Sequence, residues 1–163
     1  MDRLKEKLLN TVNKLTTISL RDDPVKYGLS DLNDKIAQVV YKKSRASRIS
    51  NVVIVKLGDA QRSLENAKSI YEMKYNRLLA KDETVTQGGT KEERVAIAKG
   101  MLLKEIKVIQ TLKNDVSEWQ DLKICIDNCL NTLKVVKELL AKQILIINDQ
   151  IHLGEIDSSS FGT

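Results

Sequence analysis

Residues 102–151 carry an unbroken amphipathic pattern, LLKEIKVIQTLKNDVSEWQDLKICIDNCLNTLKVVKELLAKQILIINDQI. Apolar side chains recur at every third or fourth position, the spacing of one face of an α-helix. The pattern has no proline, and after Gly100 the next glycine is Gly154, where a helix C-cap is expected. It therefore predicts one long helix with an apolar stripe made of Leu102, Ile106, Ile109, Leu112, Val116, Trp119, Leu122, Ile126, Cys129, Leu133, Val136, Leu140, Ile144, Ile147 and Ile151.

A helix over 91–153 would be roughly 90 Å long at about 1.5 Å per residue. A stripe of that length needs a partner helix, from the same chain or from another copy, because it cannot be buried in a compact globule. We expect self-association through this helix. The residues predicted to make the contact are Ile109, Leu112, Val116, Trp119, Ile126, Leu133, Val136, Leu140, Ile144 and Ile147.

The N-terminal half is helical in pattern as well. A first stripe over about 2–20 contains Leu4, Leu8, Val12, Leu15 and Ile18. Pro24 and Gly28 end it, because proline disfavours helix in the preceding residue and glycine marks turns. A second helical pattern begins with Ser30 as the expected N-cap and continues to about residue 80. Three serines in 44–50 leave open whether this segment is one helix or two.

A second interruption lies at 81–90, where Gly88 and Gly89 predict a hinge loop. Thr90 and Glu93 form a capping box, a strong signal for the start of a helix. The order of segments predicts an N-terminal helical region at 1–80 with the basic surface and a hinge at 81–90. An oligomerisation helix at 91–153 and a polar, disordered tail at 154–163 follow. The expected fold is all-α, an elongated helical hairpin of coiled-coil type.

The composition agrees with this class: 42% of the residues are hydrophobic and only 4% aromatic, with one proline. Sheet proteins draw more heavily on aromatic residues and turn signals. No apolar run reaches the roughly 18 residues of a membrane-spanning helix. The first turn, MDRLKEK, has no apolar signal-peptide core, so a cytoplasmic protein is expected.

The sequence contains few of the residue patterns that catalysis requires. No phosphate-binding glycine loop occurs, and His152 is the only histidine, which leaves no hydrolytic triad of a familiar type. Cys125 and Cys129 are four residues apart but lack partner ligands, so two buried small apolar side chains are expected rather than a zinc site. Trp119 lies on the apolar stripe and is expected to be structural. We therefore expect no catalytic site, metal or cofactor.

The net charge is +5, and the excess is concentrated in one segment. Residues 30–80 contain ten basic and five acidic residues, whereas 91–153 contain ten and nine. The densest part is the run YKKSRASR at 41–48, and a second cluster at 68–77 interleaves tyrosines with cations. That combination suits a single strand, because cations contact phosphates and aromatic rings stack on bases. The predicted nucleic-acid contacts are Lys42, Lys43, Arg45, Arg48, Lys68, Tyr71, Lys74, Tyr75 and Arg77. Alternatively, the tyrosines are partly buried helix residues and the cations only keep a helix soluble.

The run EWQDLKICIDNCLNTLK at 118–134 has a tryptophan, a cysteine about two turns later and a closing small-Leu-polar-x-apolar-Lys pattern. Together with Tyr41-x-Lys43, the Ala60-Gln61 pair and the order of the elements, it resembles the UvsY-like recombination mediators of tailed bacteriophages. The basic pair that precedes a double tyrosine in that family is not intact here, since the cations and tyrosines of 68–77 have a different spacing.

The resemblance implies a ring-like homo-oligomer assembled through the C-terminal helix. It also implies binding to single-stranded DNA and help for a RecA-like recombinase in displacing a single-strand-binding protein, without catalysis or cofactor. The alternative is a structural or scaffolding coiled-coil protein of a phage or cytoplasmic assembly. A membrane-surface protein is disfavoured, because the stripes are aliphatic and have no interfacial tryptophans.

Overall fold

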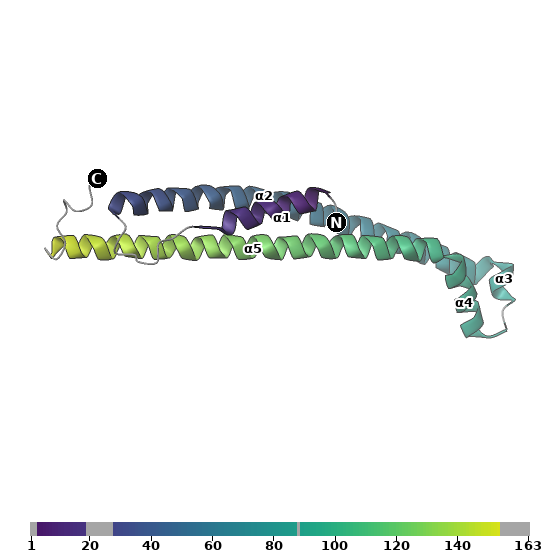
Figure 1. Ribbon diagram of the computed structural model, residues 1–163. Coiled ribbons are helices and arrows are strands. Elements are labelled where there is room, and N and C mark those ends of the chain that lie inside the picture. The colour runs from purple at the N-terminus through teal and green to yellow at the C-terminus, as the bar shows by residue number, and fades with distance from the viewer. Residues whose placement is uncertain (1–2, 19–27, 88, 154–163) are drawn as a thin grey trace. The chain divides into compact units, whose positions relative to one another are not determined.

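The computed structural model describes residues 3–18, 28–87 and 89–153, and these form five helices and no strand. The helices are α1 (Arg3–Thr16), α2 (Leu29–Lys81), α3 (Glu83–Thr86), α4 (Lys91–Met101) and α5 (Leu103–His152), all labelled in Figure 1. The predicted all-α class with long helices is confirmed. The expected turn around Pro24 and the expected tail at 154–163 lie outside the described residues.

α2 is a single helix of 53 residues, so the three serines of 44–50 do not interrupt it. Its first backbone hydrogen bond runs from Leu32 N to Gly28 O at 3.1 Å. The helix therefore begins just before Ser30, and the expected N-cap at that serine is wrong.

The packing of the chain divides into two units. Unit 1 contains Met1–Val53 and Leu122–Thr163, and unit 2 contains Ile54–Asp121. Each of the long helices α2 and α5 contributes one part to each unit.

The core of unit 1 follows a repeat of seven residues. Leu32, Val39, Ala46 and Val53 are buried on α2, and Ile126, Leu133, Leu140 and Ile147 are buried on α5. A seven-residue repeat of buried positions is the pattern of left-handed coiled-coil packing.

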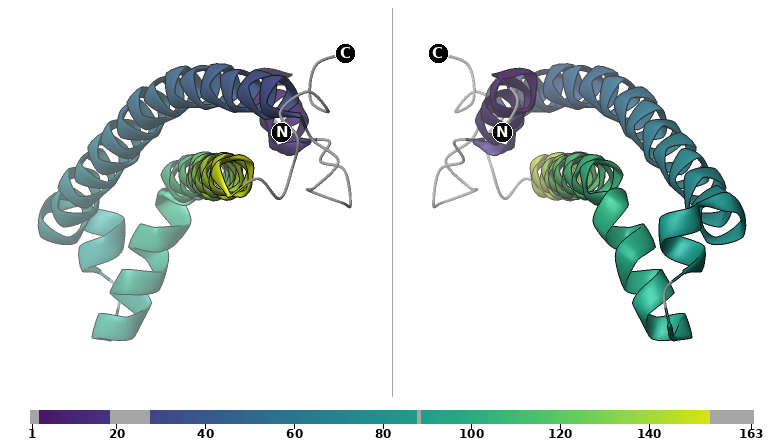
Figure 2. Two further views of the ribbon diagram at one scale, coloured as in Figure 1. Left: turned by 90° about the vertical axis from the view of Figure 1, so that its left-hand side faces the viewer. Right: turned by 90° about the vertical axis from the view of Figure 1, so that its right-hand side faces the viewer.

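α1 is the third helix of unit 1. Figures 1 and 2 both place it beside the N-terminal part of α2. It buries Lys5, Val12 and Leu15, whereas Leu4, which was predicted to lie on its apolar stripe, is 40% exposed. The buried face of α1 is therefore turned slightly away from the predicted one.

In unit 2, α3 and α4 pack against each other. Asp82 caps α3 by accepting bonds from the backbone N–H groups of Thr84 and Val85. The predicted capping box of α4 is confirmed: the Thr90 hydroxyl accepts from Glu93 N at 3.2 Å, and Thr90 N donates to the Glu93 carboxylate at 2.9 Å. The segment expected as a hinge loop thus contains a one-turn helix.

The single helix predicted over 91–153 is two helices. α4 ends at Met101, and Leu102 has φ −103° and ψ 21°, outside the helical range. Its N–H bonds to Lys99 O at 3.2 Å, a three-residue step that tightens the last turn. Gly100 lowers helix stability here by about 1 kcal/mol relative to alanine. The Leu102 side chain is buried, which favours the break between α4 and α5.

Candidate nucleic-acid interface

A groove of about 380 Å³ opens on unit 1 between α1 and α2. From α2 it is lined by Tyr41, Arg45, Arg48 and Val52, which share one helix face because they follow a four-, three- and four-residue spacing. Leu8 of α1 closes the other side. Ser44 and Ile49 complete the lining.

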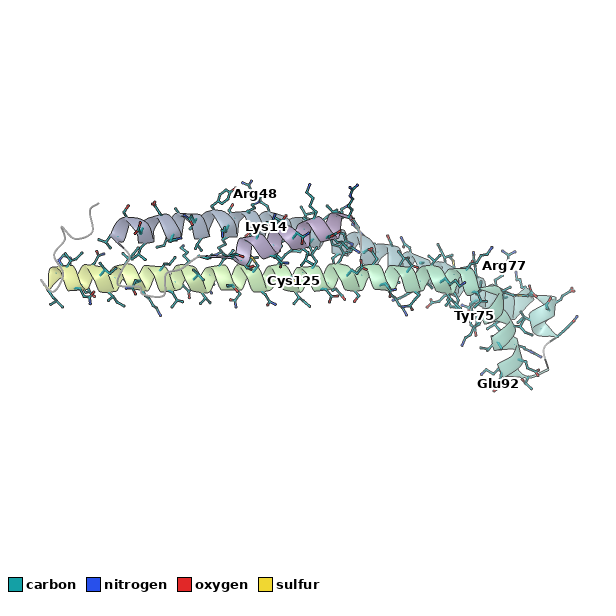
Figure 3. The ribbon with its side chains drawn as sticks, in the orientation of Figure 1. Lys14, Arg48, Tyr75, Arg77, Glu92 and Cys125 are labelled. Atoms are coloured by element: carbon teal, nitrogen blue, oxygen red, sulfur yellow. The ribbon has the colours of Figure 1, made fainter. Side chains whose placement is uncertain are left out.

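The polar groups of this groove are open to solvent. Tyr41 is 65% exposed, and Arg45 and Arg48 are exposed. Neither arginine makes an ion pair or a side-chain hydrogen bond to another described part of the chain. Figure 3 shows Arg48 on α2. Two unpaired guanidinium groups beside an exposed phenol ring can bind phosphates and stack a base.

Lys42 and Lys43 do not line this groove, although the sequence predicts them as contacts. The Lys42 ammonium donates a hydrogen bond to the backbone oxygen of Thr17, just after the end of α1. Lys42 therefore holds α1 against α2. Lys43 is two residues from Arg45, and residues two apart on a helix do not share a face.

The cysteines differ in environment. Cys129 is buried in unit 1, where burial raises the pKa of its thiol and the nearby charge of Lys42 partly opposes this rise. Cys125 is exposed, so the prediction that both cysteines are buried is wrong for this residue. Across the described residues, no group of three histidine, cysteine or acidic side chains is placed to hold a metal ion.

The second predicted cluster, at 68–77, lies in unit 2 and is largely neutralised. Lys68 pairs with Glu65 at 2.7 Å, and Lys74 pairs with Glu105 of α5 at 2.5 Å. The hydrogen bond from Lys74 is the main cause that lowers the pKa of the Glu105 carboxyl. Because a carboxylate already pairs with each of these lysines, they are less available to bind a phosphate than Arg45 and Arg48 are.

The two tyrosines of this cluster stack on each other. The rings of Tyr71 and Tyr75 stack at 5.9 Å between centroids with 13° between their planes, and both residues are half-buried. Arg77 lines a separate pocket of about 430 Å³. Figure 3 labels Arg77 and Tyr75 near the end of α2. That pocket also contains Asp82 and Glu105, so its charge is mixed.

Three cations that the sequence did not single out lie on α1. Arg3, Lys7 and Lys14 are exposed and line a shallow depression with Leu4, Glu6, Asn10 and Thr11. Their spacing of four and seven residues places them on one face. The sequence signal for this basic face is the spacing of its cations on the predicted first helix.

The residues predicted to contact a second copy are buried or half-buried within the single chain. Ile126, Leu133, Leu140 and Ile147 are buried in unit 1, and Val116 and Trp119 are buried in unit 2. The remaining four are half-buried: Ile109, Leu112, Val136 and Ile144. A different face of α5 in unit 1 carries exposed apolar side chains, which are Ile124, Val135, Leu139 and Ile146.

Comparisons with protein families, with curated proteins and with solved structures found no match to this chain. No described helix is long and apolar enough to cross a lipid bilayer.

Proposed function

We propose that this protein is a single-stranded-DNA-binding recombination mediator, which helps a RecA-like recombinase to replace a single-strand-binding protein on DNA. The observation that carries the proposal is the groove of unit 1, in which Tyr41 lies on the same helix face as the unpaired Arg45 and Arg48. The proposed setting is the cytoplasm of a phage-infected bacterium, and no catalysis or cofactor is part of the activity.

The groove has the chemistry that a flexible single strand requires. Arginine binds phosphate through two parallel N–H groups, and its charge does not titrate in the physiological range. An exposed aromatic ring stacks any base, worth about 1–3 kcal/mol per base. The apolar floor formed by Leu8, Ile49 and Val52 suits unstacked bases, which a duplex does not present.

Self-association through the exposed face of α5 in unit 1 is the second part of the proposal. Ile124 and Ile146 each lie eleven residues from Val135, on either side of it. Two copies of α5 paired antiparallel about Val135 would therefore bring Ile124 opposite Ile146 twice, as an isologous contact requires. Several copies would combine weak grooves into tight binding by raising the effective concentration.

The groove is tested with the double variant Arg45→Ala/Arg48→Ala and fluorescence anisotropy of labelled oligo-dT over a range of salt. We expect at least tenfold weaker binding at low salt. We also expect the slope of log affinity against log salt to fall by about 1.4, since each phosphate contact on a single strand contributes about 0.7.

The matched control is Arg62→Ala/Lys68→Ala. It removes the same two charges from positions of α2 whose side chains are already paired, Arg62 with Asp59 and Lys68 with Glu65. The control should bind nearly as tightly as the unaltered protein. Equal losses in the two variants would mean that net charge rather than the groove attracts DNA.

A scaffolding coiled-coil protein is the second candidate, favoured by the seven-residue repeat of buried positions in unit 1. It shares self-association with the mediator but predicts no affinity for oligo-dT. Absence of binding at low salt would therefore reject the mediator and leave the scaffold.

A further inference from the structure

The short helix α1 has a distribution of charge that packing alone does not require. Four of its 14 residues are basic and only Glu6 is acidic. Lys5 is buried, whereas the other three basic residues are exposed on one face. Among the described residues, none of Arg3, Lys7 and Lys14 has an ion pair or a side-chain hydrogen bond.

α1 is held in a definite place beside the groove. Lys42 of α2 bonds to the oxygen of Thr17 at one end, and Leu8 contacts the groove that Arg45 and Arg48 line nearer the other end. The two helices therefore run antiparallel here, as Figure 1 shows. Figure 3 shows Lys14 on α1 and Arg48 on α2 in this part of unit 1.

The basic face of α1 and the groove both have α1 residues in their lining. Leu8 borders the groove, and Leu4, one turn away on the same helix, borders the depression that contains Arg3 and Lys7. Leu4 is 40% exposed, so each of the two linings has an apolar side chain of α1 beside its cations.

We infer that α1 is a second phosphate-binding element, so that one single strand contacts Arg3, Lys7 and Lys14 on α1 as well as Arg45 and Arg48 on α2. Tyr41, in the groove with Arg45 and Arg48, stacks a base. This inference rests on the proposed function, because it names further contacts of the same site. The ligand is a single strand rather than a duplex, because the apolar and aromatic side chains beside the cations, Leu4, Leu8 and Tyr41, take up unpaired bases.

The inference is tested with the triple variant Arg3→Ala/Lys7→Ala/Lys14→Ala and labelled oligo-dT. We expect a loss of affinity of at least tenfold and a fall in the salt slope of about 2, from three lost contacts. The control variant Lys107→Ala/Lys113→Ala/Lys134→Ala removes the same charge from exposed positions of α5 and should change little. Circular dichroism checks that all variants keep their helix content.

Lysine acetylation with and without oligo-dT, read by mass spectrometry of the unaltered protein, tests contact directly. Lys7 and Lys14 should be protected by the strand, while Lys107 keeps its reactivity. If Arg45→Ala/Arg48→Ala weakens binding but the α1 variant binds normally and its lysines stay reactive, α1 is not part of the site and the proposed function stands. If the unaltered protein does not bind oligo-dT at low salt, the proposed function and this inference both fall.

Discussion

Arg45 and Lys43 are two residues apart on α2, yet only Arg45 lies in the groove. The difference comes from the helical period, which turns neighbouring cations to different faces. Lys42, Lys68 and Lys74 are bonded to a carbonyl or a carboxylate. The charge available to a ligand is thus a property of each side chain and its surroundings, not of the local density of basic residues.

The two cysteines give a prediction at this scale. Under native conditions at pH 8, a thiol reagent such as Ellman's reagent should modify Cys125 quickly and Cys129 only after addition of denaturant. Cys129 is buried, and its raised pKa leaves less thiolate at that pH. In Cys125→Ser the fast phase should vanish. Two fast thiols in the native protein would contradict the packing of unit 1.

At the scale of elements, α5 has two apolar faces in unit 1 with different roles. The buried face packs inside the chain, and the exposed face does not. The apolar stripe predicted from the sequence corresponds to the buried face, because the buried positions of a helix recur every three or four residues. The exposed set, with Leu139 and Ile146 seven residues apart, is outside that stripe.

A pair of substitutions separates the faces. Leu133→Ala should lower the free energy of unfolding by about 2–5 kcal/mol, because it leaves a cavity in the core. Leu139→Ala removes the same atoms from a position that is 57% exposed in a single copy, so at protein concentrations too low for self-association it should have a much smaller effect. Urea denaturation of both variants measures the difference. Equal losses would show that the two faces are assigned wrongly.

At the scale of the whole molecule, the proposed self-association and the proposed strand binding use different surfaces. The proposed contact between copies is on α5, whereas the groove is formed by α1 and α2. Substitutions on one surface should therefore leave the other intact at the level of a single copy. The proposal requires both surfaces for tight binding to long strands, since several grooves would act together.

Val135→Glu tests this division, because a carboxylate buried at the centre of the proposed contact is costly. Sedimentation velocity should show a smaller assembly than that of the unaltered protein, with unchanged helix content. Lys134→Glu, at the neighbouring exposed position on a different face, should assemble normally. If Val135→Glu assembles as the unaltered protein does, the contact between copies lies elsewhere.

The sequence by itself determined the all-α class, the long helices and the capping box at Thr90 and Glu93, because these depend on the periodicity of side chains and on hydrogen bonds within a few residues. Two of the residues predicted as nucleic-acid contacts, Arg45 and Arg48, line the groove of unit 1.

The tertiary structure decided the rest. It set the break at Leu102, the burial of the α5 stripe within the chain, and the joining of Tyr41, Arg45 and Arg48 with Leu8 of a distant helix. A helical pattern shows which residues share a face but not which helix covers that face. The pairing of α1, α2 and α5 in unit 1 alone supplied that information, and it showed that α1 belongs beside the candidate site.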